Sequence, residues 1–343
     1  MAAKHMQQNF NRRQFIRTAS TAAVGLGVNN FLKPYPPTLF QNAGRVGIIG
    51  LDTSHSVAFT KSLNAPDPLP ELKGYKVVAA YPKGSADIES STKRIAGYTE
   101  DVKKMGVEIV GSIEDLLKKV DFVLLETNDG RPHLEQALLV VKAGKPMFID
   151  KPVAGSLKDV IAIYETAKKY KVPIFSSSSL RYMESVQDVV KGKIGNVLGA
   201  DTFSPATIEK THPDLFWYGI HGVEMLFAVM GTGCQQVTRV STNDTDIVIG
   251  TWKDGRMGTF RGTRTGKHDY GGTVYGEKGN LSLGPFNGYD NLLVQIINFF
   301  RTGQAPVSPE ETLEIYAFME AADESKRKNG TLVSLEAVIK KAS

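Results

Sequence analysis

The turn after the apolar run 45–50 carries the first side chains that could do chemistry. It reads Gly50-Leu51-Asp52-Thr53-Ser54-His55. A dinucleotide site has a glycine-rich turn here, so that the backbone can approach the pyrophosphate at a helix N-terminus. Only Gly50 of the G-x-G-x-x-G pattern is present, because Asp52 and His55 occupy the other two glycine positions. The two hydroxyls between them could donate to a phosphate, whereas Asp52 would repel one unless it caps the helix. The turn fits a dinucleotide site or a helix N-cap without a ligand.

A second candidate is Lys151, which stands between Asp150 and Pro152 at the end of the apolar run 146–149. Ligands bind outside the carboxyl ends of strands in open parallel sheets, so a lysine here is placed to meet one. The alternative is a surface lysine in a turn. His221 is a third candidate, and its alternative is a hydrogen-bonded core histidine on a helix over 217–229.

The end of the second strand bears on the choice of cofactor. An Asp or Glu is expected there to bind the adenosine ribose of NAD, but the strand ends in Tyr81-Pro82-Lys83-Gly84-Ser85. Lys83 and Ser85 could tolerate a 2′-phosphate, so we expect NAD or NADP, held tightly.

Elements that alternate between strand and helix must position these residues. Short apolar runs predict buried parallel strands at 45–50, 75–81, 108–111, 121–126, 146–149 and 172–175. Helices are expected between them at 57–63, 113–119, 133–143 and 157–169. This order predicts a doubly wound parallel sheet of the Rossmann type over residues 45–175.

The pattern changes after residue 176. Thr- and Val-rich runs with tight turns predict an antiparallel sheet from strands at 196–208, 236–242, 245–252, 258–262, 273–275 and 280–283. Two helices close the chain, at 291–301 and 310–328. We therefore expect an α/β chain with a second, α+β domain at 176–343, whose open-faced sheet favours a homo-oligomer, dimer or tetramer.

The charge distribution argues against nucleic acid as a partner. The net charge is +5, but five of the 41 basic residues and no acidic one precede Arg45, which leaves 36 of each sign. Residues 1–44 are read as a leader and linker. Asn11-Arg12-Arg13-Gln14-Phe15-Ile16-Arg17 resembles a twin-arginine export signal, which implies a periplasmic protein. No apolar run could span a bilayer, and the single cysteine, Cys234, excludes an internal disulfide.

Motifs along the body of the chain resemble the glucose–fructose oxidoreductase/inositol dehydrogenase (Gfo/Idh/MocA) family from Arg45 to the C-terminus. They are Leu124-Leu125-Glu126-Thr127-Asn128, His133, Ala143-Gly144-Lys145-Pro146, Asp150-Lys151-Pro152, Arg181-Tyr182, Gly192-Lys193-Ile194-Gly195 and Gly219-Ile220-His221 with Glu224. Asp150 replaces the glutamate of the family's Glu-Lys-Pro motif.

The resemblance implies hydride transfer between a nicotinamide and a hydroxyl-bearing carbon of a sugar or cyclitol. It makes His221 the acid or base and Lys151 the group that orients the hydroxyl and polarises the carbonyl. The implied cofactor-binding residues are Gly50, Asp52, Thr53, Ser54, His55, Thr127, Asn128, His133, Asp150 and Lys151.

The chain departs from the family pattern at Trp217, where an aspartate often stands four residues before the histidine. An indole cannot take a proton but can stack on a sugar ring. The expected substrate-binding residues are Arg181, Trp217, Tyr218 and His212. No metal is expected, since the spacing of the histidines supports no standard ligand set.

Three functions remain open. The leading one is an exported NAD(P)-dependent oxidoreductase that acts on a secondary alcohol of a sugar, glycoside or cyclitol. A second is an NAD-dependent glycosidase that works by transient oxidation and elimination. The third is a sugar or nucleotide binding or sensor protein without catalysis, which the altered turn and Trp217 favour.

Overall fold

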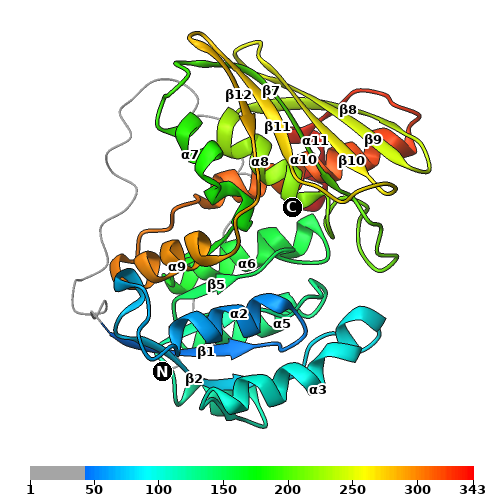
Figure 1. Ribbon diagram of the computed structural model, residues 1–343. Coiled ribbons are helices and arrows are strands. Elements are labelled where there is room, and N and C mark those ends of the chain that lie inside the picture. The colour runs from blue at the N-terminus through cyan, green and yellow to red at the C-terminus, as the bar shows by residue number, and fades with distance from the viewer. Residues whose placement is uncertain (1–42) are drawn as a thin grey trace, which may run out of the picture.

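The computed structural model describes residues 43–343, so the twin-arginine signal predicted within residues 1–42 lies outside the described residues. Two sheets organise this part of the chain, one above the other in Figure 1. Between residues 43 and 343, no helix has both the length and the apolar character needed to cross a membrane.

The first sheet has six parallel strands in the order β3-β2-β1-β4-β5-β6. They are β1 (Gly44–Ile49), β2 (Tyr75–Tyr81), β3 (Glu108–Ile109), β4 (Phe122–Leu125), β5 (Met147–Ile149) and β6 (Ile174–Ser176). All residues of β4, β5 and β6 are buried, as expected of strands covered on both faces. The predicted Rossmann-type sheet is confirmed.

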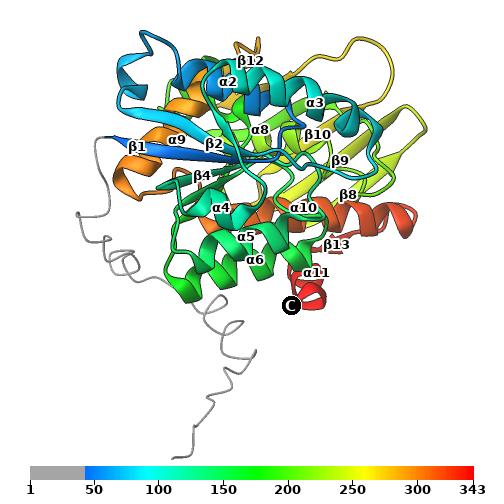
Figure 2. The ribbon, with the colours of Figure 1, turned by 90° about the horizontal axis from the view of Figure 1, so that it is seen from below.

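Helices cover both faces of this sheet (Figure 2). One face packs against α4 (Ile113–Leu117), α5 (His133–Lys142) and α6 (Leu157–Tyr170). The other packs against α2 (Ser54–Leu63), α3 (Glu89–Lys104) and α9 (Asp290–Thr302).

Helix α9 comes from the C-terminal half of the chain, beyond the second sheet. Its Phe300 stacks on Phe122 of β4 with ring centroids 4.6 Å apart, and its Phe299 meets Phe175 of β6 at 4.8 Å. Six of its side chains are buried in the core of the first sheet. By its packing, α9 therefore belongs to the first domain, although residues 176–343 were assigned together to the second.

The second sheet has seven strands in the order β12-β11-β7-β10-β9-β8-β13. They are β7 (Val197–Pro205), β8 (Cys234–Ser241), β9 (Thr245–Trp252), β10 (Met257–Thr263), β11 (Gly271–Gly276), β12 (Gly279–Leu283) and β13 (Val333–Ser334). The expectation of a purely antiparallel sheet is wrong at one place, because β7 and β10 pair in parallel. The chain returns from β7 through α8 (Ile220–Met230) and a β8–β9 hairpin, so β10 enters the sheet beside β7 in the same direction.

One face of the second sheet is buried and the other is open. Helices α8 and α10 (Pro309–Arg327) pack on the inner face, where Val237, Val248 and Phe260 are fully buried. The outer face leaves apolar side chains accessible, among them Val240 at 64% and Met257 at 61% exposure.

Three helices were not predicted from apolar spacing: α3, α7 (Glu184–Val190) and α11 (Leu335–Ala342). Helix α3 buries only Ser91 and Val102, so its sequence carries almost no apolar stripe to indicate it.

Candidate active site

The turn after β1 approaches the neighbouring strand end closely. Gly50 has φ +92°, and a Cβ atom there would lie 2.4 Å from the backbone nitrogen of Thr127. Only glycine fits such a contact and such a dihedral angle. Helix α2 then begins after Thr53, whose hydroxyl accepts a bond from the His55 N–H at 3.5 Å. Ser54 is exposed in a first turn without acidic residues, so the helix N-terminus is open to an anion.

The side chain of Asp52 points into the protein, and its role in cofactor binding stays a prediction. Its carboxylate is fully buried and accepts the backbone N–H of Ser85 at 2.9 Å and of Asn128 at 3.0 Å. A Cβ atom at Gly84 would lie 2.1 Å from this carboxylate, so the residue after Lys83 must also be glycine. Burial raises the pKa of Asp52, which these two backbone bonds oppose. Asp52 therefore ties together the loops after β1, β2 and β4.

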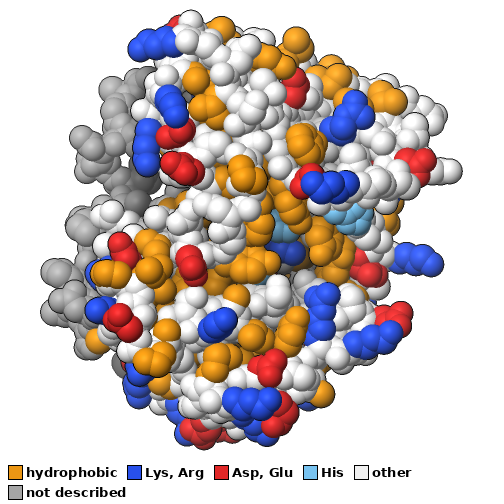
Figure 3. All heavy atoms as spheres, viewed as in Figure 1, with side chains coloured by type: hydrophobic (Ala, Val, Ile, Leu, Met, Phe, Trp, Pro, Cys, Tyr) orange, Lys and Arg blue, Asp and Glu red, His pale blue; other side chains and the backbone are white. Residues whose placement is uncertain are grey.

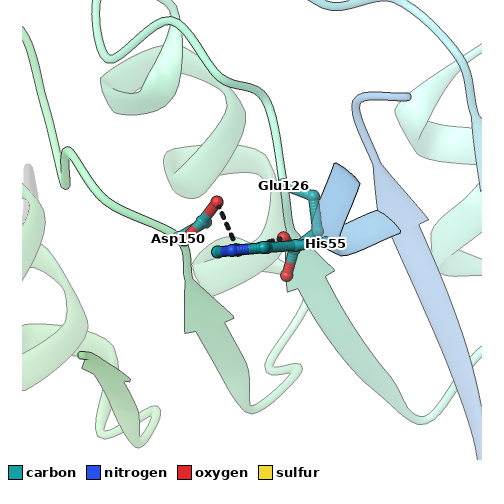
Figure 4. A group of neighbouring side chains, drawn as sticks. All are labelled: His55, Glu126 and Asp150. Atoms are coloured by element: carbon teal, nitrogen blue, oxygen red, sulfur yellow. Dashed lines mark ion pairs between the residues drawn. The ribbon is translucent and has the colours of Figure 1, made fainter. Parts of the chain in front are cut away.

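His55 also turns inward instead of facing a cofactor. Its Nδ1 lies 3.0 Å from Asp150 Oδ2 and 3.9 Å from Glu126 Oε2, and all three side chains are buried (Figure 4). Its ring packs edge-on against Tyr289 at 4.4 Å. Burial and the neighbouring Asp150 raise the pKa of Glu126 well above its ordinary value, against the attraction of Lys151.

The predicted cofactor residues after β4 have protein partners too. The Thr127 hydroxyl donates to Gln136 at 3.0 Å, and the Asn128 amide donates to Ser91 at 3.2 Å. The fully buried His133 places its two ring nitrogens 2.7 Å from the Thr127 carbonyl and 3.2 Å from the Val153 carbonyl. Burial lowers the pKa of His133. His133 therefore holds the loops after β4 and β5 together, and its contact with a cofactor stays a prediction.

Lys151 and His221 approach each other from the two domains. Lys151 follows β5, and its ammonium lies 5.4 Å from the ring centroid of Tyr218. His221 lies in the first turn of α8, with its ring 5.9 Å from that of Tyr218 and 5.8 Å from that of Tyr270. Figure 3 shows histidine and basic side chains in a hollow between the domains, bordered by apolar side chains. Lys151 and His221 thus share one aromatic neighbour.

The electrostatics of His221 favour the neutral imidazole. Burial, and next the positive charge of Lys151, hold the pKa of His221 well below its ordinary value. Its Nδ1 lies 2.8 Å from the hydroxyl of Ser178, and its Nε2 has no hydrogen-bond partner among residues 43–343. Ser178, and not Glu224, therefore orients this imidazole.

Arg181 is placed differently from the prediction that it binds substrate. Its Nε donates to Glu224 at 2.8 Å, a second guanidinium nitrogen donates to Glu311 at 2.5 Å, and the side chain is buried. Glu224 also accepts the hydroxyl of Ser177 at 2.9 Å. The guanidinium is thus held by buried ion pairs with Glu224 and Glu311, and its contact with a substrate stays a prediction.

The remaining predicted substrate residues divide into buried and accessible ones. His212 accepts the Gly130 N–H at 3.0 Å and lies against the buried Trp217, with ring centroids 5.1 Å apart. Burial lowers the pKa of His212. These two side chains join the second domain to the loop after β4. Both ring nitrogens of His212 have protein partners, because Nδ1 lies 2.9 Å from the hydroxyl of Thr211. Tyr218 alone is half-buried beside Lys151.

Sequence reasoning missed several side chains around this site. Ser178 lies in a run of four serines, Ser176 to Ser179, which begins at the last residue of β6, and that run is the signal that could have found it. Tyr289 carried no signal that separated it from other loop residues, and Glu126 was noted only as part of the motif Leu124 to Asn128. Of the residues proposed for a 2′-phosphate, Ser85 is buried and donates to Asp129 at 2.8 Å, which leaves Lys83 alone.

Comparison with known proteins identifies the first domain. Residues 44–178 match the family model GFO_IDH_MocA, described as an oxidoreductase family with an NAD-binding Rossmann fold. No curated protein matches the chain.

Solved structures share the two-domain fold. They include scyllo-inositol dehydrogenase from Lactobacillus casei with NAD(H) and scyllo-inositol bound, at 17% identity, covering 86% of this chain and 100% of that one, with a TM-score of 0.69. Myo-inositol 2-dehydrogenase from Lactobacillus plantarum matches at 18% identity, covering 85% and 99%, with a TM-score of 0.68. A probable dehydrogenase from Thermotoga maritima matches at 20% identity, covering 86% and 99%, with a TM-score of 0.69. The family match supports an NAD-dependent dehydrogenase, and residues 44–178 are similar to the NAD-binding Rossmann domain of that oxidoreductase family.

Proposed function

We propose that the chain transfers hydride to or from a secondary alcohol of a sugar, glycoside or cyclitol. The observation that carries this proposal is the convergence of Lys151 and His221 from separate domains on the ring of Tyr218. The two structural neighbours that act on inositols support a cyclitol or a related polyol as the substrate.

The chain's own residues suit the movement of a proton. If the Nδ1–H of His221 donates to Ser178, its Nε2 is free to accept the proton of a substrate hydroxyl. The low pKa of His221 keeps this nitrogen unprotonated near neutral pH. Lys151 would hold the substrate oxygen as negative charge develops on it. Bound NAD would accept the hydride that leaves the same carbon.

The turn after β1 fits a dinucleotide despite its missing glycines. Gly50 lets the backbone of the turn lie close to Thr127, and the exposed Ser54 stands at the open N-terminus of α2. Asp52 points into the protein, so its carboxylate is removed from the space in which it would repel a pyrophosphate. Gly50, Thr53, Ser54 and Lys151 are the residues we propose to hold the cofactor.

The first test is to purify the full chain, unfold it, and identify any released nucleotide by mass spectrometry. We expect NAD at close to one per chain, and we then expect cyclitols and sugars to change the nicotinamide absorbance. A chain that is purified empty and does not bind added NAD or NADP would contradict the proposal and favour a binding or sensor protein. Release of sugar from a glycoside without net change in absorbance would favour the elimination mechanism.

Two substitutions then test the residue roles. His221→Asn and Lys151→Met should each lower kcat by about 10²–10⁴-fold, the range for a positioned acid–base group. Lys142→Met is the matched control for the lysine, because Lys142 is exposed in the last turn of α5. Normal turnover by either site variant would refute the role of that residue.

The open face of the second sheet supports a homo-oligomer as part of the proposal. Val240, Met257 and Tyr275 lie exposed on β8, β10 and β11, where an apolar face of a monomer would be unusual. A dimer or tetramer formed through this face would cover them.

Export through the twin-arginine pathway to the periplasm is also proposed, on the sequence Asn11 to Arg17 alone. Residues 1–44 fused to a folded reporter should direct it to the periplasm. Replacement of Arg12 and Arg13 by lysine should stop this transport, and undiminished transport would contradict the proposal.

A further inference from the structure

Three side chains meet at the carboxyl edge of the first sheet, below Lys151. Glu126 directly follows β4, Asp150 directly follows β5, and His55 lies in the first turn of α2 after β1 (Figure 4). Because β1, β4 and β5 are neighbours in the sheet, their ends bring these side chains together. One nitrogen or oxygen atom from each lies within 4.8 Å of the others.

Not all of these buried atoms have a partner. Both carboxylate oxygens of Glu126 have no hydrogen-bond partner among residues 43–343, whereas His55 Nδ1 and Asp150 Oδ2 lie 3.0 Å apart as an ion pair without a well-aligned hydrogen bond. The side chains of Glu126 and Asp150 have no exposed surface, and that of His55 is only 7% exposed. A buried polar atom without a partner costs about 1–3 kcal/mol, so such groups are rare without a function. The two oxygens of Glu126, beside the His55–Asp150 pair, indicate a missing ligand.

The charges in this cluster indicate the sign of that ligand. Glu126 and Asp150 place two carboxylates side by side in the interior, and Asp52 adds further negative charge. Lys151 is the positive group that acts on both. His55 faces Asp150, but nothing between residues 43 and 343 bonds the two oxygens of Glu126. A divalent cation would neutralise the carboxylate pair and accept all three side chains as ligands.

The donor set also indicates the class of cation. One imidazole nitrogen and two carboxylates form a mixed set that suits Zn²⁺, Mn²⁺ and Fe²⁺, whereas Mg²⁺ and Ca²⁺ prefer oxygen alone. The outer contacts suit a metal site as well, because Asp150 Oδ1 accepts the backbone N–H of Lys151 at 2.8 Å and leaves Oδ2 free. We propose that His55, Glu126 and Asp150 bind one first-row divalent metal ion. This revises the expectation that the chain has no metal site.

The proposal goes beyond the dehydrogenase function and does not depend on it. A bound ion would join the ends of three central strands through their side chains. It would also fix Asp150, whose carboxylate holds the backbone of Lys151. The role of the ion is therefore to hold the strand ends and Lys151 in place.

The test is metal binding by the untagged full chain after treatment with a chelator. The protein is dialysed separately against Zn²⁺ and against Mn²⁺, and bound metal is counted by mass spectrometry. We expect close to one ion per chain. Glu126→Gln keeps the shape of the side chain but removes its charge, and it should weaken binding by more than about 100-fold, since outer-shell partners alone contribute 10–100-fold.

Asp129→Asn is the matched control. Asp129 is another buried carboxylate beside a histidine, 3.4 Å from His212, but its oxygens are bonded by Arg131 and Ser85. This variant should bind metal as the wild type does. Equal binding by Glu126→Gln and the wild type, or no binding of either ion by the wild type, would overturn the proposal.

Thermal unfolding gives a second measurement that does not rely on counting metal. Zn²⁺ in excess should raise the Tm of the wild type by several degrees and leave that of Glu126→Gln unchanged, because only a folded site binds it. If Glu126 instead carries a proton, its neutral glutamine analogue should match the wild type in Tm with and without Zn²⁺. That result would refute the metal site, whereas loss of dehydrogenase activity alone would not bear on it.

Discussion

Replacing Asp52 with glycine would restore the second glycine of the dinucleotide-binding pattern. The pattern by itself predicts that Asp52→Gly binds NAD more tightly, because a carboxylate near a pyrophosphate is repulsive. The structure predicts a different result. The carboxylate points away from the open end of α2 and accepts two backbone N–H groups, from Ser85 and Asn128, in the interior. Its removal would therefore loosen the turn that should bind the cofactor.

The size of this effect follows from the two bonds. In Asp52→Gly the N–H groups of Ser85 and Asn128 lose acceptors that lie 2.9 and 3.0 Å away. Each buried donor without a partner costs about 1–3 kcal/mol, so the free energy of unfolding should fall by about 2–6 kcal/mol. Burial raises the pKa of Asp52, which shows that the buried carboxylate is poorly solvated. The substitution removes this desolvation cost, which offsets part of the loss in the free energy of unfolding.

Urea unfolding at constant pH measures this change, and calorimetric titration measures the affinity for NAD. We expect Asp52→Gly to unfold at lower urea concentration and to bind NAD more weakly. Asp67→Gly is the control, because the Asp67 side chain is 91% exposed and its loss should change stability by about 0.5 kcal/mol or less. A variant as stable as the wild type that binds NAD more tightly would refute this account of Asp52.

Three further outcomes are expected. Burial raises the pKa of Asp323, on α10, to about 7. The protonated Asp323 carboxyl therefore contributes to the free energy of unfolding below pH 4, and this contribution is lost as the pH rises through 7. Urea unfolding should show that the wild type loses about 4 kcal/mol over this interval relative to Asp323→Asn, and parallel pH curves would contradict this. Arg181→Met removes the partner of two glutamates and should lower the free energy of unfolding by about 3–5 kcal/mol. The KM of the folded enzyme for its substrate should not change. A raised KM at normal stability would instead support Arg181 as a substrate residue. Met257→Lys places a charge on the open face of the second sheet. Analytical ultracentrifugation should show more monomer for this variant than for the wild type. A wild type that sediments as a monomer would contradict the proposed oligomer.

The fold was largely predictable because buried parallel strands have a distinct sequence pattern. Runs such as Phe122–Leu125 and Met147–Ile149 are apolar at every position, which a sheet covered on both faces requires. The parallel pairing of β7 with β10 was not predictable, because alternating strands look alike whichever way the neighbouring strand runs. Helix α3 was not predicted, because a mostly solvated helix buries few apolar side chains and its sequence shows little periodicity.

The site was less predictable than the fold, because residue type does not fix the direction of a side chain. Asp52 and His55 both lie in the expected turn, yet both side chains point into the protein. Arg181 was predicted as a substrate-binding residue, and the sequence did not show that Glu224 and Glu311 reach it from α8 and α10, which are distant in sequence. Such partners become visible only when the chain is folded.

The return of α9 to the first sheet affects how the chain folds during its synthesis. When residues up to β6 have left the ribosome, Phe122 and Phe175 still lack the two phenylalanine rings that cover them, since α9 is made only after most of the second sheet. The N-terminal domain therefore cannot complete its core before the second domain is nearly finished. Chains truncated before Asp290 should expose this apolar surface, bind chaperones and aggregate, so folding of the two domains is coupled.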